Sequence, residues 1–255
     1  MTAPADFHEL LRKIGIRLSD DELHALVDDA HKKQLSPAQV LEKLASAEAK
    51  ERARRNLDRR AHAAALGAMK PLDKFEWDWP KSLDRVLVDK LVALDFVDRN
   101  DNILLRGPSG LGKTTLAKNI GLLALQKGLH VRFATLAAAL TDVVRHDGLL
   151  ARERRLKRYT RPDVLILDEV GYIPHDAASA DIFFHIVSHR HERASTIVTT
   201  NLPYKSWGDV FGGASSVQVS VDRFAQHCHT VDIEGESYRA KKSESTTIAK
   251  TPKRR

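Results

Sequence analysis

Glycine, lysine and hydroxyl side chains recur at a chemically suggestive spacing in residues 106–115, RGPSGLGKTT. The stretch follows the apolar run 103–105 and precedes an amphipathic segment, so it lies between a predicted strand and a predicted helix. In the pattern G-x-x-x-x-G-K-[ST], backbone N–H groups and the helix N-terminus surround nucleotide phosphates. Gly-rich turns also form plain strand-to-helix corners, but here both flanking elements are present. The residues predicted to contact the nucleotide are Gly107, Pro108, Ser109, Gly110, Leu111, Gly112, Lys113, Thr114 and Thr115.

A second stretch supplies the acidic groups that nucleotide hydrolysis needs. Residues 164–167, VLIL, form a continuous apolar run typical of a buried parallel strand, which ends in Asp168 and Glu169. Asp168 is placed to hold Mg²⁺ through water, and Glu169 to polarise the water that attacks the γ-phosphate. In the phosphate loop, Lys113 would reach the β- and γ-phosphates and the Thr114 hydroxyl would ligate Mg²⁺. Alone, the acidic pair could be a strand-to-loop boundary; with the loop, it predicts an ATPase.

Two further side chains have candidate roles at the same site. Asn201 ends the apolar strand 195–201, where it can lie between the γ-phosphate and the attacking water. Asn before Leu-Pro is also an ordinary turn former, so both interpretations stay open. Phe75, Trp77 and Trp79 lie in a segment with the composition of a linker. They are expected to pack against the next domain, with Phe75 beside a bound adenine ring as one placement and simple docking to the core as the other.

Composition limits the class of protein. The 255 residues suffice for one nucleotide-binding domain and a small extra unit. The single cysteine, Cys228, rules out an internal disulfide and fits a reducing compartment. No apolar run approaches the length of a membrane span, and the N-terminus lacks the features of a signal peptide, so we expect a cytoplasmic protein without a membrane partner. The net charge of +7 favours a polyanionic partner, with nucleic acid the leading candidate.

The order of predicted elements indicates an α/β fold behind a helical start. Residues 1–67 read as a small all-helical N-terminal domain, with capping boxes at Ser19 and Ser36, and its last helix can extend to Leu66. Residues 68–83 form the aromatic linker. Residues 84–240 alternate helices with buried strands, which predicts a parallel sheet flanked by helices. The basic tail, residues 241–255, has almost no core-forming residues and is expected to be disordered.

Basic side chains are concentrated between the second and third predicted strands. No matching acidic run adjoins them in the sequence, so they are candidates for phosphate contacts with DNA, although a solvated helical face is an alternative. The basic helix at residues 52–60 is a weaker second candidate. The predicted DNA contacts are Arg145, Arg152, Arg154, Arg155, Lys157 and Arg158.

With these motifs assembled, the chain resembles the IstB-like helper ATPases of bacterial insertion sequences, relatives of the DnaC helicase loaders in the AAA+ class of P-loop NTPases. The likeness covers residues 72–241 and includes GPSGLGKTT, LILDEVGYIP, TTNLPYKSWGDVFG, the DRF-to-HCH segment and GESYR. It implies that Arg223 is an arginine finger supplied to a neighbouring subunit, Arg239 the second sensor and Asn201 the first. From chemistry alone, Arg223 and Arg239 suit γ-phosphate charge but could equally be surface salt-bridge residues.

The resemblance implies an oligomeric AAA+ ATPase, with ATP and Mg²⁺ at subunit interfaces, that binds duplex DNA and assists a cognate transposase in target selection and transposition. Two alternatives remain from the sequence. One is a DnaC-like loader of a replicative helicase acting on single-stranded DNA. The other is an ATP-gated DNA scaffold with little turnover. The segment before Asp222-Arg223 is more polar than the family pattern leads one to expect, so the helix there is uncertain.

Overall fold

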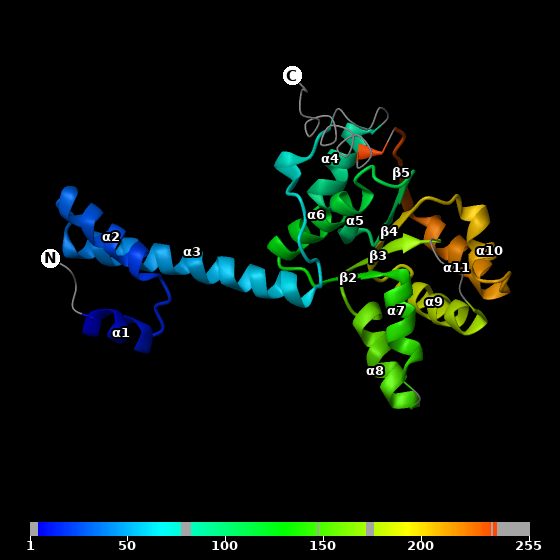
Figure 1. The fold of residues 1–255 in the computed structure, drawn as a ribbon, viewed down its shortest axis with the longest axis horizontal. Helices are drawn as coiled ribbons and strands as arrows, with labels where there is room; N and C mark the ends of the chain where they lie inside the picture. Colours follow the sequence, from blue (N-terminus) through cyan, green and yellow to red (C-terminus); the bar gives the residue numbers. More distant parts are fainter. Residues whose placement is uncertain (1–4, 78–82, 147, 172–175, 236, 239–255) are drawn as a thin grey trace, which may run out of the picture. The chain divides into compact units, whose positions relative to one another are not determined.

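The computed structural model describes residues 5–77, 83–146, 148–171, 176–235 and 237–238 (Figure 1). The chain divides into two compact units, Met1–Arg60 and Ala61–Arg255. Within the described residues, no helix is both long enough and apolar enough to cross a bilayer.

The N-terminal unit is helical, as the sequence predicts. It contains α1 (Ala5–Lys13), α2 (Asp20–Lys32) and most of α3 (Pro37–Ala63), which ends three residues before Leu66. Ser19 caps α2 in a capping box with Glu22, and the predicted box at Ser36 also forms, since the backbone N–H of Ser36 donates to Gln39 Oε1 at 2.8 Å. A small apolar cluster holds the helices together through Leu11, Leu18, Leu23, Ile16, Leu44 and Ala47.

The second unit contains a five-stranded parallel sheet in the order β2-β3-β4-β1-β5. The strands are β1 (Asn102–Arg106), β2 (Val131–Thr135), β3 (Val164–Val170), β4 (Ser195–Thr200) and β5 (Cys228–Asp232). The helices are η1 (Leu72–Lys74), α4 (Arg85–Ala93), α5 (Asp95–Asp98), α6 (Lys113–Gln126), α7 (Leu136–Val144), α8 (Leu149–Thr160), α9 (Ala177–Arg190), η2 (Tyr204–Ser206), α10 (Trp207–Val210) and α11 (Ser215–Gln226). The predicted α/β fold with a parallel sheet is therefore confirmed.

Both faces of the sheet are covered, because the apolar residues of each buried strand alternate between two cores. Leu104, Leu165 and Leu167 belong to a large core cluster with residues of α7, α9, α10 and α11. On the other face, α6 packs so closely that a Cβ at Gly121 would lie 2.8 Å from Ile166 Cδ1. In Figure 1 the sheet lies between α4, α5 and α6 on one side and α9, α10 and α11 on the other. The carboxyl ends of all five strands therefore meet at one edge.

Two C-terminal elements were uncertain or unassigned in the sequence. The polar stretch before Asp222 does form a helix, α11, which buries Val217, Ser220, Val221 and Phe224. These residues are spaced three or four apart, so the helix needs only one narrow apolar stripe against α9. β5 then pairs with β1 as an edge strand, and of its five residues only Val231 is fully buried. A strand so weakly apolar gives little sequence signal.

Candidate active site

The loop between β1 and α6 forms the floor of a cavity of about 290 Å³. Gly107 and Gly112 show why the backbone of this loop needs glycine. Gly107 has φ +153° and a Cβ there would lie 2.1 Å from the Ile233 carbonyl oxygen; Gly112 has φ +85° and a Cβ there would lie 2.7 Å from the Phe75 ring. The loop is therefore packed between the chain after β5 and the linker aromatic, with the N-terminus of α6 open to the cavity.

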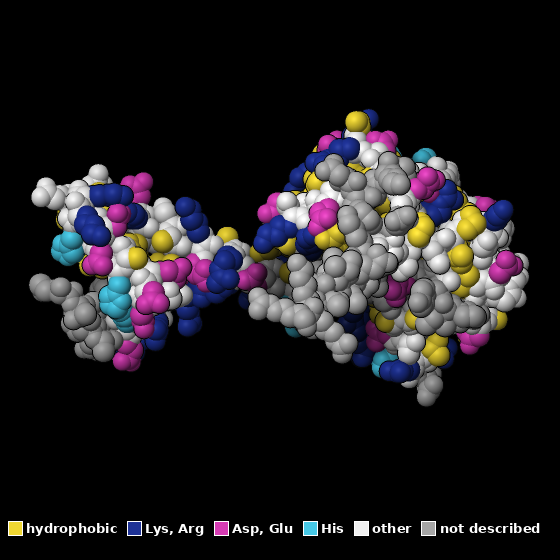
Figure 2. Space-filling model, turned by 45° about the horizontal axis from the view of Figure 1, so that its top comes forward, with side chains coloured by type: hydrophobic (Ala, Val, Ile, Leu, Met, Phe, Trp, Pro, Cys, Tyr) yellow, Lys and Arg dark blue, Asp and Glu magenta, His cyan; other side chains and the backbone are white. Residues whose placement is uncertain are grey.

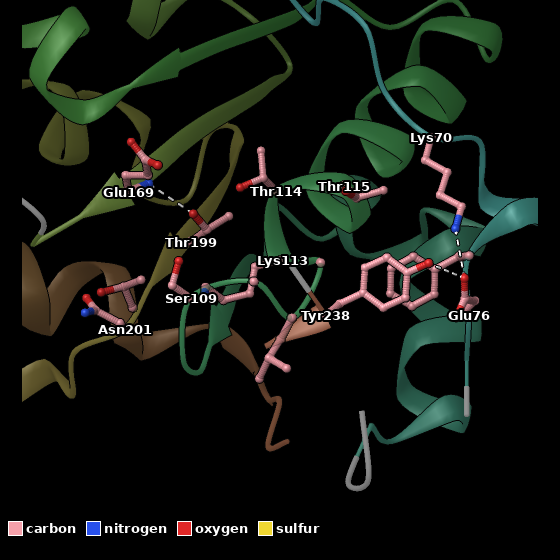
Figure 3. A pocket seen from close by; sticks show the side chains of 15 residues that line it. Lys70, Glu76, Ser109, Lys113, Thr114, Thr115, Glu169, Thr199, Asn201 and Tyr238 are labelled. Carbon is pink, nitrogen blue, oxygen red and sulfur yellow. Dashed lines mark hydrogen bonds and ion pairs between the residues drawn. The ribbon is translucent and has the colours of Figure 1, made fainter. Parts of the chain in front are cut away.

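The cavity collects residues from five parts of the chain at the carboxyl edge of the sheet. Figure 3 shows Ser109, Glu169, Thr199 and Asn201 at one end and Lys70, Glu76 and Tyr238 at the other, with Lys113 and Thr114 between them. The lining residues are Lys70, Phe75, Glu76, Ser109, Gly110, Leu111, Gly112, Lys113, Thr114, Thr115, Glu169, Thr199, Thr200, Asn201 and Tyr238. Of the sequence-predicted nucleotide contacts, only Gly107 and Pro108 lie outside this lining; both hold Lys113, whose ammonium donates to their carbonyl oxygens at 2.6 Å each.

Thr114 and Asp168 lie together, although 54 residues separate them. The Thr114 hydroxyl donates to Asp168 Oδ1 at 2.9 Å, and Asp168 is only 4% exposed. A hydroxyl and a buried carboxylate side by side are hard oxygen donors of the kind that Mg²⁺ prefers, with its remaining positions filled by water and phosphate. The two residues therefore fit a Mg²⁺ site beside the phosphate loop.

Glu169 and Asn201 both reach the same end of the cavity from neighbouring strands. Glu169 is the sixth residue of β3, and its exposed side chain contrasts with its buried neighbours Asp168 and Val170. Its φ of +61° is unusual for a residue with a side chain. Asn201 directly follows β4. A carboxylate and an amide at the phosphate end can orient a water molecule for attack on a phosphoryl group.

The opposite end of the cavity is lined by the aromatic side chains of Phe75 and Tyr238, and Tyr238 forms a hydrogen bond with Glu76 there. Phe75 lies against Gly112, and its ring centroid is 4.7 Å from that of Trp77, so the linker packs on the nucleotide-binding unit. Tyr238 donates from its hydroxyl to Glu76 Oε1 at 2.5 Å, and this bond raises the pKa of Tyr238. Trp79 lies outside the described residues. An apolar ring and a tyrosine at a distance from the phosphate loop suit a planar base.

Residues 12–246 match the sequence family described as IstB-like ATP binding protein. The chain belongs to this family. It is 33% identical over 239 residues to the "Insertion sequence IS21 putative ATP-binding protein" of Pseudomonas aeruginosa, covering 94% of this chain and 90% of the relative. The "Insertion sequence IS232 putative ATP-binding protein" of Bacillus thuringiensis subsp. berliner is also 33% identical, over 91% of this chain and 92% of the relative.

Solved structures with the same fold belong to the AAA+ class of ATPases. The structure titled "Crystal Structure of the DnaI" matches with a TM-score of 0.55 and 16% identity, over 68% of this chain and 90% of that one. "Replication initiator DnaA bound to AMPPCP and single-stranded DNA" matches with a TM-score of 0.52 and 20% identity, over 68% of this chain and 54% of that one. At these identities the likeness establishes the fold alone. Together with the family, it makes this IstB-like chain an AAA+ ATPase.

Of the two arginines that the family resemblance assigns to the site, Arg223 lies within the described residues and Arg239 does not. Arg223 lies on α11, outside the cavity lining of its own chain, where its guanidinium donates to the Ser188 hydroxyl and lies 5.3 Å from the Phe184 ring centroid. These neighbours leave the group half-buried on a surface of the ATPase unit. Arg239 lies outside the described residues. Its neighbour Tyr238 lines the cavity.

The basic stretch begins at Arg145, directly after α7, and forms most of α8, and the structure divides its charges into two groups. Asp142 of α7 forms ion pairs with Arg155 at 3.7 Å and with Arg158 at 3.2 Å. Lys157 forms an ion pair with Glu153 at 3.0 Å. The pairing with Asp142 was not expected from the sequence, because Asp142 comes from the neighbouring helix.

The other three arginines of the basic stretch are more accessible to a phosphate group. Arg152 donates to the His146 carbonyl at 2.7 Å. Within the described part of the chain, Arg145, Arg152 and Arg154 have no carboxylate at ion-pair distance, and all three side chains are exposed.

The weaker candidate, the basic segment of α3, is largely neutralised. Arg54 pairs with Glu51 and Asp58, and Arg55 pairs with Glu48 and Glu51. Figure 2 shows Lys and Arg side chains interspersed with Asp and Glu over this unit. A mixed surface of this kind favours a solvated helix over a phosphate track.

Sequence reasoning missed several cavity residues. Thr199 is one of two threonines at the end of β4, and buried hydroxyl residues directly before Asn201 were the available signal. Lys70 and Glu76 flank Phe75 in the linker and lie 3.3 Å apart. They could not be assigned, because the folding of the linker back onto the loop is a tertiary feature.

Proposed function

We propose that the chain hydrolyses ATP in this cavity, with Lys113 binding the β- and γ-phosphates and Glu169 polarising the attacking water. The observation that carries the proposal is the Thr114–Asp168 hydrogen bond beside the phosphate loop, 2.9 Å long, with Glu169 next in sequence and open to the cavity. Mg²⁺, held by Thr114 and Asp168, would neutralise charge on the phosphate oxygens during transfer. Asn201 would orient the water from the neighbouring strand.

The base of ATP would lie at the aromatic end, with Phe75 on one side. Both arginines assigned by resemblance act on the γ-phosphate in this proposal, Arg239 from the same chain and Arg223 from a neighbouring one. Arg223 lies outside the cavity of its own chain, which supports a role across a subunit interface. Homo-oligomers with nucleotide between subunits follow from that role.

The proposal extends to duplex DNA and a cognate transposase. Its support is that relatives matching nine-tenths of this chain are named as ATP-binding proteins of insertion sequences. Exposed arginines without carboxylate partners among the described residues, Arg152 and Arg154 above all, supply phosphate contacts. Phosphate contacts position a protein without reading bases, so target choice on DNA would depend little on sequence.

DNA binding is tested by measuring affinity for a duplex against salt concentration, with ATP and without nucleotide. Each lost phosphate contact reduces the slope of log affinity against log salt by about 0.9, so Arg154→Ala should lose about one such step. Arg99→Ala is the matched control, because it removes the same charge from an arginine already paired with Asp101 at 2.9 Å. Equal slopes for Arg154→Ala, Arg152→Ala and the wild type would refute this surface.

The same titration with single-stranded DNA of equal length separates the proposal from helicase loading. A transposition helper should prefer the duplex and need ATP to bind it. Tighter ATP-dependent binding to the single strand would instead favour a loader.

A further inference from the structure

β3 carries a bulge where its two acidic residues lie. Leu167 pairs with Val198 and Val170 pairs with Thr200, so Asp168 and Glu169 together oppose the single residue Thr199 of β4. On its other side β3 stays in regular register with β2 as far as Asp168. The irregularity is therefore confined to the side that faces β4, at the point where β3 reaches the cavity.

The side chain of Thr199 forms hydrogen bonds with both residues of the bulge. Its hydroxyl accepts the backbone N–H of Glu169 at 3.0 Å and donates to Asp168 Oδ1. The first of these contacts is drawn in Figure 3. Asp168 Oδ1 thus receives two hydroxyls, from Thr199 and from Thr114, the latter at 2.9 Å. Thr199 is 1% exposed, so water cannot replace it at either partner without rearrangement.

The backbone of Glu169 needs this support. At φ +61° it is in the left-handed region, which non-glycine residues rarely adopt and which persists where surrounding contacts hold it. A return of this φ to the β region would change the direction in which the Glu169 side chain leaves the strand, because the backbone dihedrals set the direction of Cβ. Beside this bulge Asp168 is buried, whereas Glu169 is exposed and lines the cavity.

We propose that Thr199 is a positioning residue of the ATPase site, whose hydroxyl holds the bulge of β3 and thereby aims Glu169 at the attacking water and Asp168 at the Thr114 side. The inference rests on the proposed roles of Glu169 and Asp168 in hydrolysis. Thr199 would act through Glu169 and Asp168, which its hydroxyl contacts. It is distinct from Asn201, which follows β4 and approaches the cavity directly.

The test compares Thr199→Val, which keeps the branched shape and removes the hydroxyl, with Thr199→Ser, which keeps the hydroxyl. Displacement of a catalytic group by about 1 Å can cost about 10²-fold in rate, so kcat should fall by about that factor in Thr199→Val. The affinity for ATP should stay within about threefold of the wild type, because the phosphate loop is unchanged. Thr199→Ser should recover most of kcat.

Thr196→Val is the matched control. Thr196 is a buried threonine of the same strand, 3% exposed, whose hydroxyl accepts from Arg190 and does not contact the acidic pair. It should lose stability while keeping kcat per folded molecule. Unfolding is followed for every variant, and Thr199→Cys, with a weakly hydrogen-bonding group of similar size, replaces Thr199→Val if that variant fails to fold.

Wild-type kcat in Thr199→Val, or an equal loss of kcat in Thr196→Val, overturns the inference. Equal losses in Thr199→Ser and Thr199→Val overturn it as well. Glu169→Gln is assayed in parallel to separate the two proposals. If Glu169→Gln is inactive and Thr199→Val is fully active, the role of Thr199 alone is wrong; if Glu169→Gln hydrolyses ATP normally, the proposed hydrolytic mechanism is wrong.

Discussion

Arg190, the last residue of α9, is a buried cation surrounded by carbonyl oxygens, and its removal should be strongly destabilising. It is 2% exposed, and burial lowers its pKa to about 9, which leaves it charged at neutral pH. Its guanidinium joins the end of α8 to the starts of β3 and β4. The acceptors are the carbonyl oxygens of Tyr159, Thr160, Pro162, Asp163 and Ser195 and the hydroxyl of Thr196.

The expected cost can be worked from the three shortest of these bonds, at 2.5, 2.7 and 2.9 Å. A hydrogen bond to a charged group contributes about 1.5–3 kcal/mol to the free energy of unfolding. Replacing Arg190 also removes the cost of burying its charge, and this offsets part of the loss. We therefore expect Arg190→Met to lower the free energy of unfolding by about 3–5 kcal/mol. At about 2–4 °C per kcal/mol for a unit of this size, Tm should fall by about 10 °C.

The assay is urea and thermal unfolding followed by tryptophan fluorescence. The tryptophans, Trp77, Trp79 and Trp207, all belong to the second unit, so the signal reports that unit alone. Arg193→Met is the control, because Arg193 is exposed and a surface change of this kind stays within about 0.5 kcal/mol. Equal stability of Arg190→Met and Arg193→Met would refute the reasoning.

Two other predictions concern Arg223 and Cys228. Mixing Arg223→Ala protein with Lys113→Ala protein should restore some ATP hydrolysis, since intact sites would form between chains; no gain over the sum of the parts, despite confirmed co-assembly, would remove the support for a role across the interface. Burial raises the pKa of Cys228 to about 11, so at pH 8 its native thiol should react with a maleimide about 10²-fold more slowly than after unfolding, and faster as pH rises toward 11. Equal rates before and after unfolding would contradict that burial.

The sequence was sufficient to predict those features that depend on residues close together in the chain. The phosphate loop, the strand that ends in Asp168 and the alternation of strands and helices depend on neighbouring residues, and the sheet confirms that architecture. The capping boxes at Ser19 and Ser36 are local too.

Features that depend on contacts between distant parts of the chain could not be predicted from the sequence. The bulge opposite Thr199 depends on the pairing of β3 with β4, and the pairing of Asp142 with Arg158 depends on α7 and α8 lying side by side. β5 was not assigned as a strand of the sheet because an edge strand with one fully buried residue lacks an apolar run.

The most direct test of the account is single-turnover ATP hydrolysis by Glu169→Gln, measured beside ATP affinity. Glutamine has the same shape as glutamate but cannot act as a base, and such a loss costs about 10²–10⁴-fold in rate. The account predicts wild-type affinity for ATP with hydrolysis slowed by that factor, whereas Lys113→Ala should lose affinity itself. Hydrolysis by Glu169→Gln at the wild-type rate would contradict the account.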